Sequence, residues 1–162
     1  MKTNKLNIFN DPIYGFIQIS DASIFDLIEH PYFQRLRRIN QLGLTYFVYP
    51  GATHTRFQHS MGAMHLMKTS LLSLQDKGIN ISQEEVVATQ QAILLHDIGH
   101  GPFSHTLEYH LLHKTSHEQV GKLILEELNR NMDGILDMAL AINKNQYDKK
   151  FLHQLVSSQL DM

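Results

Sequence analysis

The sequence predicts a mostly α-helical domain that begins with a short β-hairpin or extended arm. From Ile24 onward, apolar residues recur at the three- and four-residue spacing of amphipathic helices. Two capping boxes, Ser82-Gln83-Glu84-Glu85 and Ser116-His117-Glu118-Gln119, mark the starts of helices. The first twenty residues instead carry strand-forming Ile, Tyr and Phe around the turn-forming Asn10-Asp11-Pro12.

Helical spacing then continues to the end of the chain. Ile24, Leu27 and Ile28 form one apolar stripe before Pro31 interrupts the pattern. In order, the expected elements are a short helix from residue 24, a helix over 32–42 that Gly43 stops, an irregular segment over 45–51, and helices over 55–75, from Ser82 to Asp97, from Ser116 onward, over 135–142 and over 151–160.

The composition fits a single domain and narrows the class of protein. With 162 residues, 43% of them hydrophobic, the chain is long enough for one core. A formal net charge of -2 gives no support for nucleic-acid binding, and the absence of cysteine excludes disulfides and thiolate metal sites. No apolar run resembles a signal peptide or could span a bilayer. We therefore expect one soluble cytoplasmic domain over residues 1–162, with the arm over 1–22 and a helical core over 23–162.

The adjacent pair His96-Asp97, at the end of an apolar run, is the most informative chemical feature. A carboxylate among apolar neighbours loses hydration and must be paired or bound to a metal. Asp97 shares a helical stripe with Ile93, and His59 lies on the apolar stripe of the preceding helix. One inward histidine is most simply a hydrogen-bonded core residue, but two helices that each aim a ligand-type side chain inward favour a metal site.

Imidazole and carboxylate donors suit Fe, Mn, Zn, Ni or Co better than Ca, and Mg stays among the divalent candidates. Without a thiolate, the site does not resemble structural zinc sites, which usually contain cysteine. The sequence therefore predicts a divalent metal ion without identifying it.

Other polar residues near the pair have both a functional and a plainer interpretation. His100 and His105 follow in a glycine-containing loop, where they could bind phosphate oxygens or transfer a proton, or be solvated. His117 lies in the first turn of its helix, which favours an anion, but could be simply exposed. Arg56 could clamp a phosphate or be a surface charge. The basic segment 34–38 is most simply a solvated face, with a nucleotide-phosphate site as the sharper alternative.

Five blocks of sequence carry a resemblance to a known family: Asn10–Gly15, Pro31–Gly43, Tyr49–Gly62, His96–His105 and Ser116–Gln119. Taken together in this order, they resemble the HD-domain metal-dependent phosphohydrolases, most closely the deoxynucleoside triphosphate triphosphohydrolase branch. The resemblance implies an HD-domain helical bundle that hydrolyses a nucleotide or another phosphoester. It also implies a homo-oligomer, with an activating nucleotide in some members.

The resemblance implies a role for each matching residue. The implied metal ligands are His59, His96 and Asp97. The implied catalytic residues are His117, His105, His100 and Glu108, the last in place of an Asp. The implied substrate-binding residues are Arg56 for phosphate, and Gln41 and Leu42 near the sugar and base. The positions that match an activating-nucleotide site are Glu29, in place of an Asp, together with Gln34 and Arg37.

The family's fourth metal ligand is an Asp in the pattern Asp-x-Asp-Arg-x-Asp-Tyr. Asp161 aligns with the first Asp of that pattern, which puts the expected ligand one residue past Met162. We therefore expect a C-terminally truncated HD domain with weak metal retention and low activity. The alternative is a non-catalytic nucleotide-binding or oligomerisation module that uses the HD scaffold for structure only.

Overall fold

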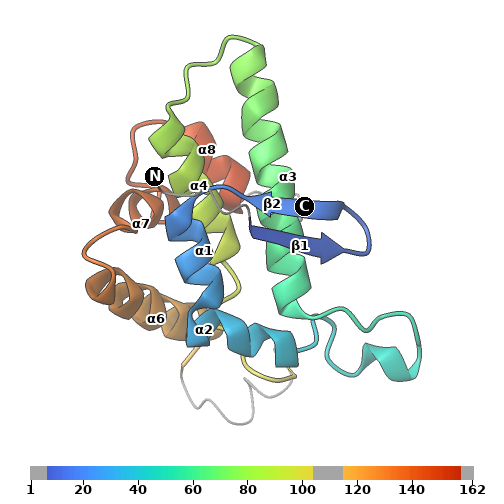
Figure 1. Ribbon diagram of the computed structural model, residues 1–162. Coiled ribbons are helices and arrows are strands. Elements are labelled where there is room, and N and C mark those ends of the chain that lie inside the picture. Colours follow the sequence, from blue (N-terminus) through green and yellow to red (C-terminus); the bar gives the residue numbers. More distant parts are fainter. Residues whose placement is uncertain (1–6, 104–114, 158–162) are drawn as a thin grey trace.

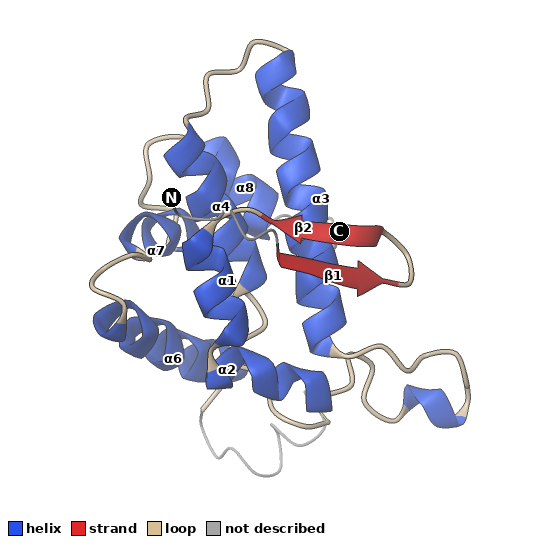
Figure 2. Ribbon diagram, in the orientation of Figure 1, coloured by secondary structure: helices blue, strands red, loops and turns tan. Residues whose placement is uncertain are grey.

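The computed structural model describes residues 7–103 and 115–157, and it has the mostly α-helical fold predicted (Figures 1 and 2). Strands β1 (Asn7–Asp11) and β2 (Gly15–Ile19) form the antiparallel hairpin at the start. Its turn is closed by the Asp11 carboxylate, whose Oδ1 accepts the backbone N–H groups of Ile13 at 2.8 Å and Tyr14 at 3.0 Å. The predicted hairpin is confirmed, although Asn10 and Asp11 belong to the strand and the turn follows them.

Helix α1 (Ala22–Glu29) begins at Asp21, whose side chain accepts the backbone N–H groups of the first turn. Ile24, Leu27 and Ile28 are all buried, as their spacing predicted. The hairpin and α1 therefore enclose one side of the core.

The helix predicted over residues 32–42 is shorter than expected. It consists of α2 (Pro31–Gln34) and a 3₁₀ turn, η1 (Arg35–Arg38), after which the chain becomes extended at Ile39. There the Ile39 carbonyl accepts the backbone N–H of Arg56 at 2.8 Å. Because this long-range pairing uses a backbone group that a further helical turn would need, the helix ends well before the glycine expected to stop it.

Helices α3 (Arg56–Asp76) and α4 (Gln83–Leu94) pack against each other at the centre of the fold (Figure 1). Capping boxes start both helices, at Thr55 and at the predicted Ser82. Helix α4 ends at Leu94 and does not continue to the His-Asp pair, because the backbone closes into tight turns there. The metal-ligand pair is therefore carried by the turn that follows α4.

The remaining described helices are α6 (His117–Asn131), α7 (Asp137–Asn143) and α8 (Lys150–Ser157). Helices α7 and α8 pack on α4, and α6 begins at the predicted Ser116 capping box. Apolar spacing alone does not identify the buried face of α6, since Leu123 is 66% exposed. The buried residues of this helix are Gly121 and Leu128, seven positions apart, and Leu123 lies off that stripe.

The core lies between the hairpin, α1, α2, α3, α4 and α7, and η1, α6 and α8 add Leu36, Leu128 and Leu152 to it. Within the described ranges, no helix combines the length and the apolar character needed to cross a membrane. The predictions for His105, Glu108 and Asp161 concern residues outside those ranges.

Candidate metal and catalytic site

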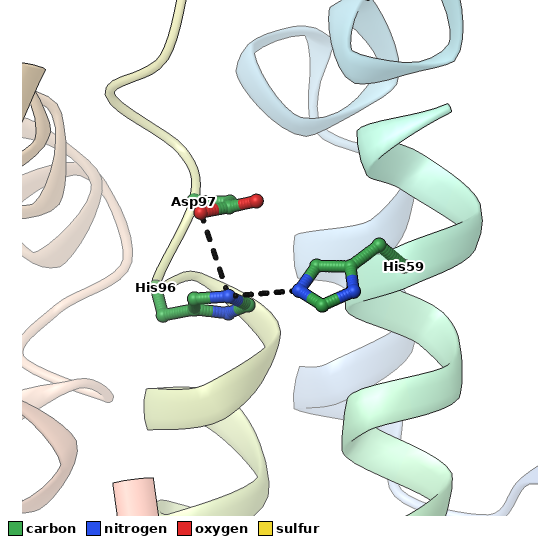
Figure 3. Close-up of side chains that lie close together, drawn as sticks. All are labelled: His59, His96 and Asp97. Atoms are coloured by element: carbon green, nitrogen blue, oxygen red, sulfur yellow. Dashed lines mark hydrogen bonds and ion pairs between the residues drawn. The ribbon is translucent and has the colours of Figure 1, made fainter. Parts of the chain in front are cut away.

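Three ligand-type side chains meet between α3 and the turn after α4. His59 comes from α3, and His96 and Asp97 come from the turn (Figure 3). His59 Nε2 lies 3.3 Å from His96 Nε2, which in turn lies 3.4 Å from Asp97 Oδ1. One donor atom from each residue lies within 4.8 Å of the others. The fold thus brings together the three residues that the sequence singled out.

A backbone carbonyl sets the orientation of the His96 ring. His96 Nδ1 lies 2.6 Å from the carbonyl oxygen of Ile93, in the last turn of α4. Since a carbonyl only accepts hydrogen bonds, Nδ1 carries a hydrogen, and Nε2 is the ring nitrogen left to bind a metal ion. Metal-binding histidines typically donate their second ring N–H in this way.

The donor set fits a divalent transition metal. Neighbouring donors 3.3 and 3.4 Å apart match ligands that each lie about 2.1 Å from one ion at a roughly tetrahedral angle. Calcium would instead require a cage of oxygen atoms. Two imidazoles and one carboxylate can therefore hold an ion of the class predicted from the sequence.

Asp97 is a buried carboxylate whose two oxygens face different groups. Oδ2 pairs with Arg56 Nη1 at 2.6 Å, and both side chains are nearly inaccessible to solvent. Burial by itself would raise the pKa of Asp97, but His96, Arg56, His100 and His59 together hold that pKa below its usual range. The carboxylate is thus ionised, with Oδ1 directed at the imidazoles. Arg56 is not a surface charge, since it is 4% exposed.

His100 and His117 stack beside this centre. Their ring centroids lie 3.9 Å apart at an interplanar angle of 16°, and His100 Nε2 lies 3.5 Å from Asp97 Oδ1. Gly99 permits the approach, because a Cβ there would lie 2.0 Å from the His117 carbonyl oxygen and 2.5 Å from the Gly121 nitrogen. The loop therefore touches the start of α6 backbone to backbone, which brings both predicted histidines to the site.

Sequence reasoning missed Arg35. Its guanidinium donates through Nη1 to the His100 carbonyl at 2.7 Å and through Nη2 to the Ile98 carbonyl. The basic segment 34–38 is predicted to be a solvated face or a nucleotide-phosphate site. Arg35 fits neither interpretation, because its side chain is half-buried and binds two backbone carbonyls. No sequence signal identifies it, because its direction depends on the 3₁₀ turn η1 and on a loop more than 60 residues away.

The residues expected near the sugar and base follow η1. The backbone N–H of Gln41 donates to the His54 carbonyl at 3.0 Å, and Gln41 Oε1 is buried without a partner among the described residues. Leu42 is 48% exposed. These contacts place Gln41 at the start of α3 but do not join it to the three candidate ligands.

The residues expected to bind an activating nucleotide fall into two groups. Arg37 Nε donates to Gln34 Oε1 at 2.8 Å, and the Arg37 guanidinium lies 3.6 Å from the centroid of the Phe57 ring. Glu29 is exposed at the end of α1. The structure therefore brings Gln34 and Arg37 together.

A cavity of about 530 Å³ adjoins His59. Its walls are the hairpin turn, the loop over 51–54 and one face of α3. Tyr14 closes one side by packing on Gly62, where a Cβ would lie 2.9 Å from the ring. A ligand bound at His59 has room to extend toward the hairpin.

Comparison with known proteins agrees with this geometry. The HD domain family matches residues 56–155, which include His59, His96 and Asp97. The deoxynucleoside triphosphate triphosphohydrolase SAMHD1 of Homo sapiens is 40% identical over 138 residues, covering 80% of this chain and 22% of the relative. The uncharacterised protein YwfO of Bacillus subtilis is 36% identical over 166 residues, covering 99% of this chain and 38% of the relative.

A solved structure shows the same fold. The crystal structure of a phosphohydrolase from Bacteroides thetaiotaomicron matches with a TM-score of 0.94 and 52% identity. The match covers 97% of this chain and 39% of that one, so the chain spans well under half the length of these relatives. The family match over most of the chain supports one conclusion: this protein belongs to the HD domain family.

Proposed function

We propose that this protein is a metal-dependent phosphohydrolase that acts on a nucleotide, with deoxynucleoside triphosphates as the first class to test. The observation that carries the proposal is the convergence of His59, His96 and Asp97, with donor atoms 3.3 and 3.4 Å apart. The names of the human relative and of the Bacteroides structure support the reaction class and, for the human relative, the substrate class.

The three ligands and Arg56 have complementary roles in this proposal. A divalent ion held by His59, His96 and Asp97 would polarise a phosphoryl oxygen and make water a nucleophile near neutral pH. Arg56 holds Asp97 Oδ2, so that Oδ1 stays directed at the imidazoles. Its positive charge also stabilises negative charge that develops on a phosphoryl group nearby.

The stacked pair His100 and His117 supplies the proton-transfer groups. Imidazole exchanges protons near neutral pH, and His100 lies beside the carboxylate of Asp97. We assign a catalytic role to both, and to His105 and Glu108 in the segment outside the described ranges. The leaving group would receive a proton from one of these histidines.

The other residues that match the family's motifs have substrate-binding or activator-binding roles in this proposal. Gln41 and Leu42 would contact the sugar and base. Glu29, Gln34 and Arg37 would bind an activating nucleotide, which the contact between Gln34 and Arg37 supports. The non-catalytic alternative is not favoured, since a purely structural scaffold would not need three ligand-type side chains around one point.

Phosphate and triphosphate release from a panel of deoxynucleotides tests the proposal. In keeping with the weak metal retention and low activity expected from the sequence, the 162-residue protein should hydrolyse at least one nucleotide slowly when each candidate metal is supplied in excess, and His96→Ala should lower that rate at least about 100-fold. His153→Ala is the matched control, because this histidine of α8 bonds the Ile142 carbonyl and belongs to a different part of the fold. Turnover that survives in His96→Ala would contradict the mechanism.

A further inference from the structure

We propose that Arg35 is a positioning residue of the metal centre: its guanidinium fixes the loop after α4, so that Asp97 stays turned toward His59 and His96. The proposal rests on the proposed metal centre and extends it to a residue on a separate element, η1. Arg35 acts on the ligands through the backbone that carries them and does not itself contact the metal.

The contact has the geometry of a two-pronged clamp. Arg35 Nη1 donates to the carbonyl of His100 at 2.7 Å, and Nη2 donates to the carbonyl of Ile98. Both carbonyls belong to the short loop directly after Asp97. A planar guanidinium offers donors in a fixed fork, so one side chain can hold two carbonyls at a set separation. Burial lowers the pKa of Arg35, yet an arginine stays charged at neutral pH.

The loop needs an external support because it lies beyond the end of α4. Its own backbone bonds are single tight turns, from Ile98 N to the Leu95 carbonyl and from His100 N to the Asp97 carbonyl, both at 3.1 Å. On its other side, Gly99 lies against the start of α6. Arg35 and α6 therefore brace the loop from two directions.

Removal of Arg35 would act on the ligand atoms. Ile98 is fully buried, so its carbonyl would lose a partner that water does not readily replace. The loop would relax, and it carries both Asp97 and the His100 ring that lies 3.5 Å from Asp97 Oδ1. If Arg35 only stabilised the fold, its removal would leave metal affinity unchanged. Because it holds the loop that carries Asp97, we expect its removal to lower metal affinity.

Cobalt titration of the metal-free 162-residue protein tests the proposal. Affinity for Co²⁺ is measured by calorimetry, and the visible absorption of bound Co²⁺ reports the ligand geometry. Arg35→Ala should weaken binding about 10–100-fold, as the loss of a group that orients a ligand typically does, and should alter the spectrum. Arg35→Lys should fall between wild type and Arg35→Ala, because an ammonium lacks the planar fork. Arg130→Ala, an exposed arginine of α6 paired with Glu127, should bind as wild type does.

The outcomes separate this proposal from the proposed function. Arg35→Ala protein that melts earlier but binds Co²⁺ with wild-type affinity and spectrum would overturn it and leave a structural brace. If Arg35→Ala does not fold, Arg35→Gln, which keeps one amide donor, takes its place under the same criterion. Wild-type protein that binds Co²⁺ but hydrolyses no nucleotide would contradict the proposed function alone. Wild-type protein that binds no Co²⁺ would overturn the metal centre and this proposal together.

Discussion

The two ends of α4 each hold a buried carboxylate, and the two carboxylates have different surroundings. Glu85, in the first turn, has a hydrogen-bond donor on each oxygen. Oε1 accepts the Tyr147 hydroxyl at 2.7 Å, and Oε2 accepts the Lys149 ammonium and the Ser82 backbone N–H, each at 2.7 Å. These contacts tie the start of α4 to the segment between α7 and α8.

Asp97 lies just beyond the last turn of α4. Among the described residues, it has a close donor on only one of its two carboxylate oxygens. Oδ2 pairs closely with Arg56 at 2.6 Å. Oδ1 faces His96 and His100 at 3.4 and 3.5 Å, which is long for a charged hydrogen bond. A carboxylate with close donors on both oxygens stabilises a fold, whereas one with an oxygen directed at imidazole nitrogens can share a metal with them. The environment of each oxygen therefore distinguishes a structural acid from a ligand.

Asp97→Asn should have the largest effect, because it removes a ligand and also the carboxylate that pairs with buried Arg56. Metal affinity should fall at least about 100-fold, and the metal-free protein should lose about 3–5 kcal/mol of unfolding free energy. Cobalt titration and urea denaturation measure the two quantities. Asp76→Asn, at the exposed end of α3, is the control. If the Asp97→Asn protein kept wild-type metal affinity, Asp97 would not be a metal ligand. The carboxylates at the two ends of α4 would then not differ in function.

Gly99→Ala should be the next most damaging, because the added Cβ would lie 2.0 Å from the His117 carbonyl oxygen. Backbone must move, so we expect a loss of up to about 3 kcal/mol of unfolding free energy together with weaker Co²⁺ binding. Gly101→Ala is the matched control in the same loop, since no described atom lies within 4 Å of its added Cβ. Equal melting temperatures for the two variants would show that the contact with α6 does not brace the site.

Glu85→Gln should reduce stability and leave the site intact. Replacement of the charged acceptor weakens the hydrogen bonds from Lys149, Ser82 and Tyr147, at a cost of about 2 kcal/mol of unfolding free energy in urea denaturation. Cobalt affinity of the folded variant should equal that of wild type, because the contacts of Glu85 lie at the opposite end of α4. Weaker Co²⁺ binding would show that the two ends are coupled through the helix.

The sequence could predict those features that depend on residues close together in the chain. The hairpin and both serine capping boxes depend on neighbours a few positions apart, and they are confirmed. The stripe of α3 is buried at Gly62, Ala63 and Met67, and His59 at its start is partly buried. The early end of the helix over 32–42 and the clamp by Arg35 depend on partners far along the chain. Periodicity contains no information about such partners, so these features were not predictable from it.

The pH dependence of stability gives the smallest and most specific test of the structural end of α4. Burial alone would raise the pKa of Glu85, but hydrogen bonds from Lys149, Ser82 and Tyr147 hold that pKa below its usual value. The unfolded chain therefore binds the proton more tightly, so the contribution of Glu85 is complete above the unfolded pKa of about 4.3 and is lost as the pH falls through the lower folded pKa.

The stability difference between wild type and Glu85→Gln should therefore be constant near neutral pH and should shrink under acid conditions, because only wild type carries this carboxylate. Urea denaturation of both proteins from neutral pH down into the acid range measures the difference. A gap that stays the same across that range would mean that the charge of Glu85 does not stabilise the fold. In that case the close donors on both of its oxygens would not identify a structural acid, and the contrast with Asp97 would depend on metal binding alone.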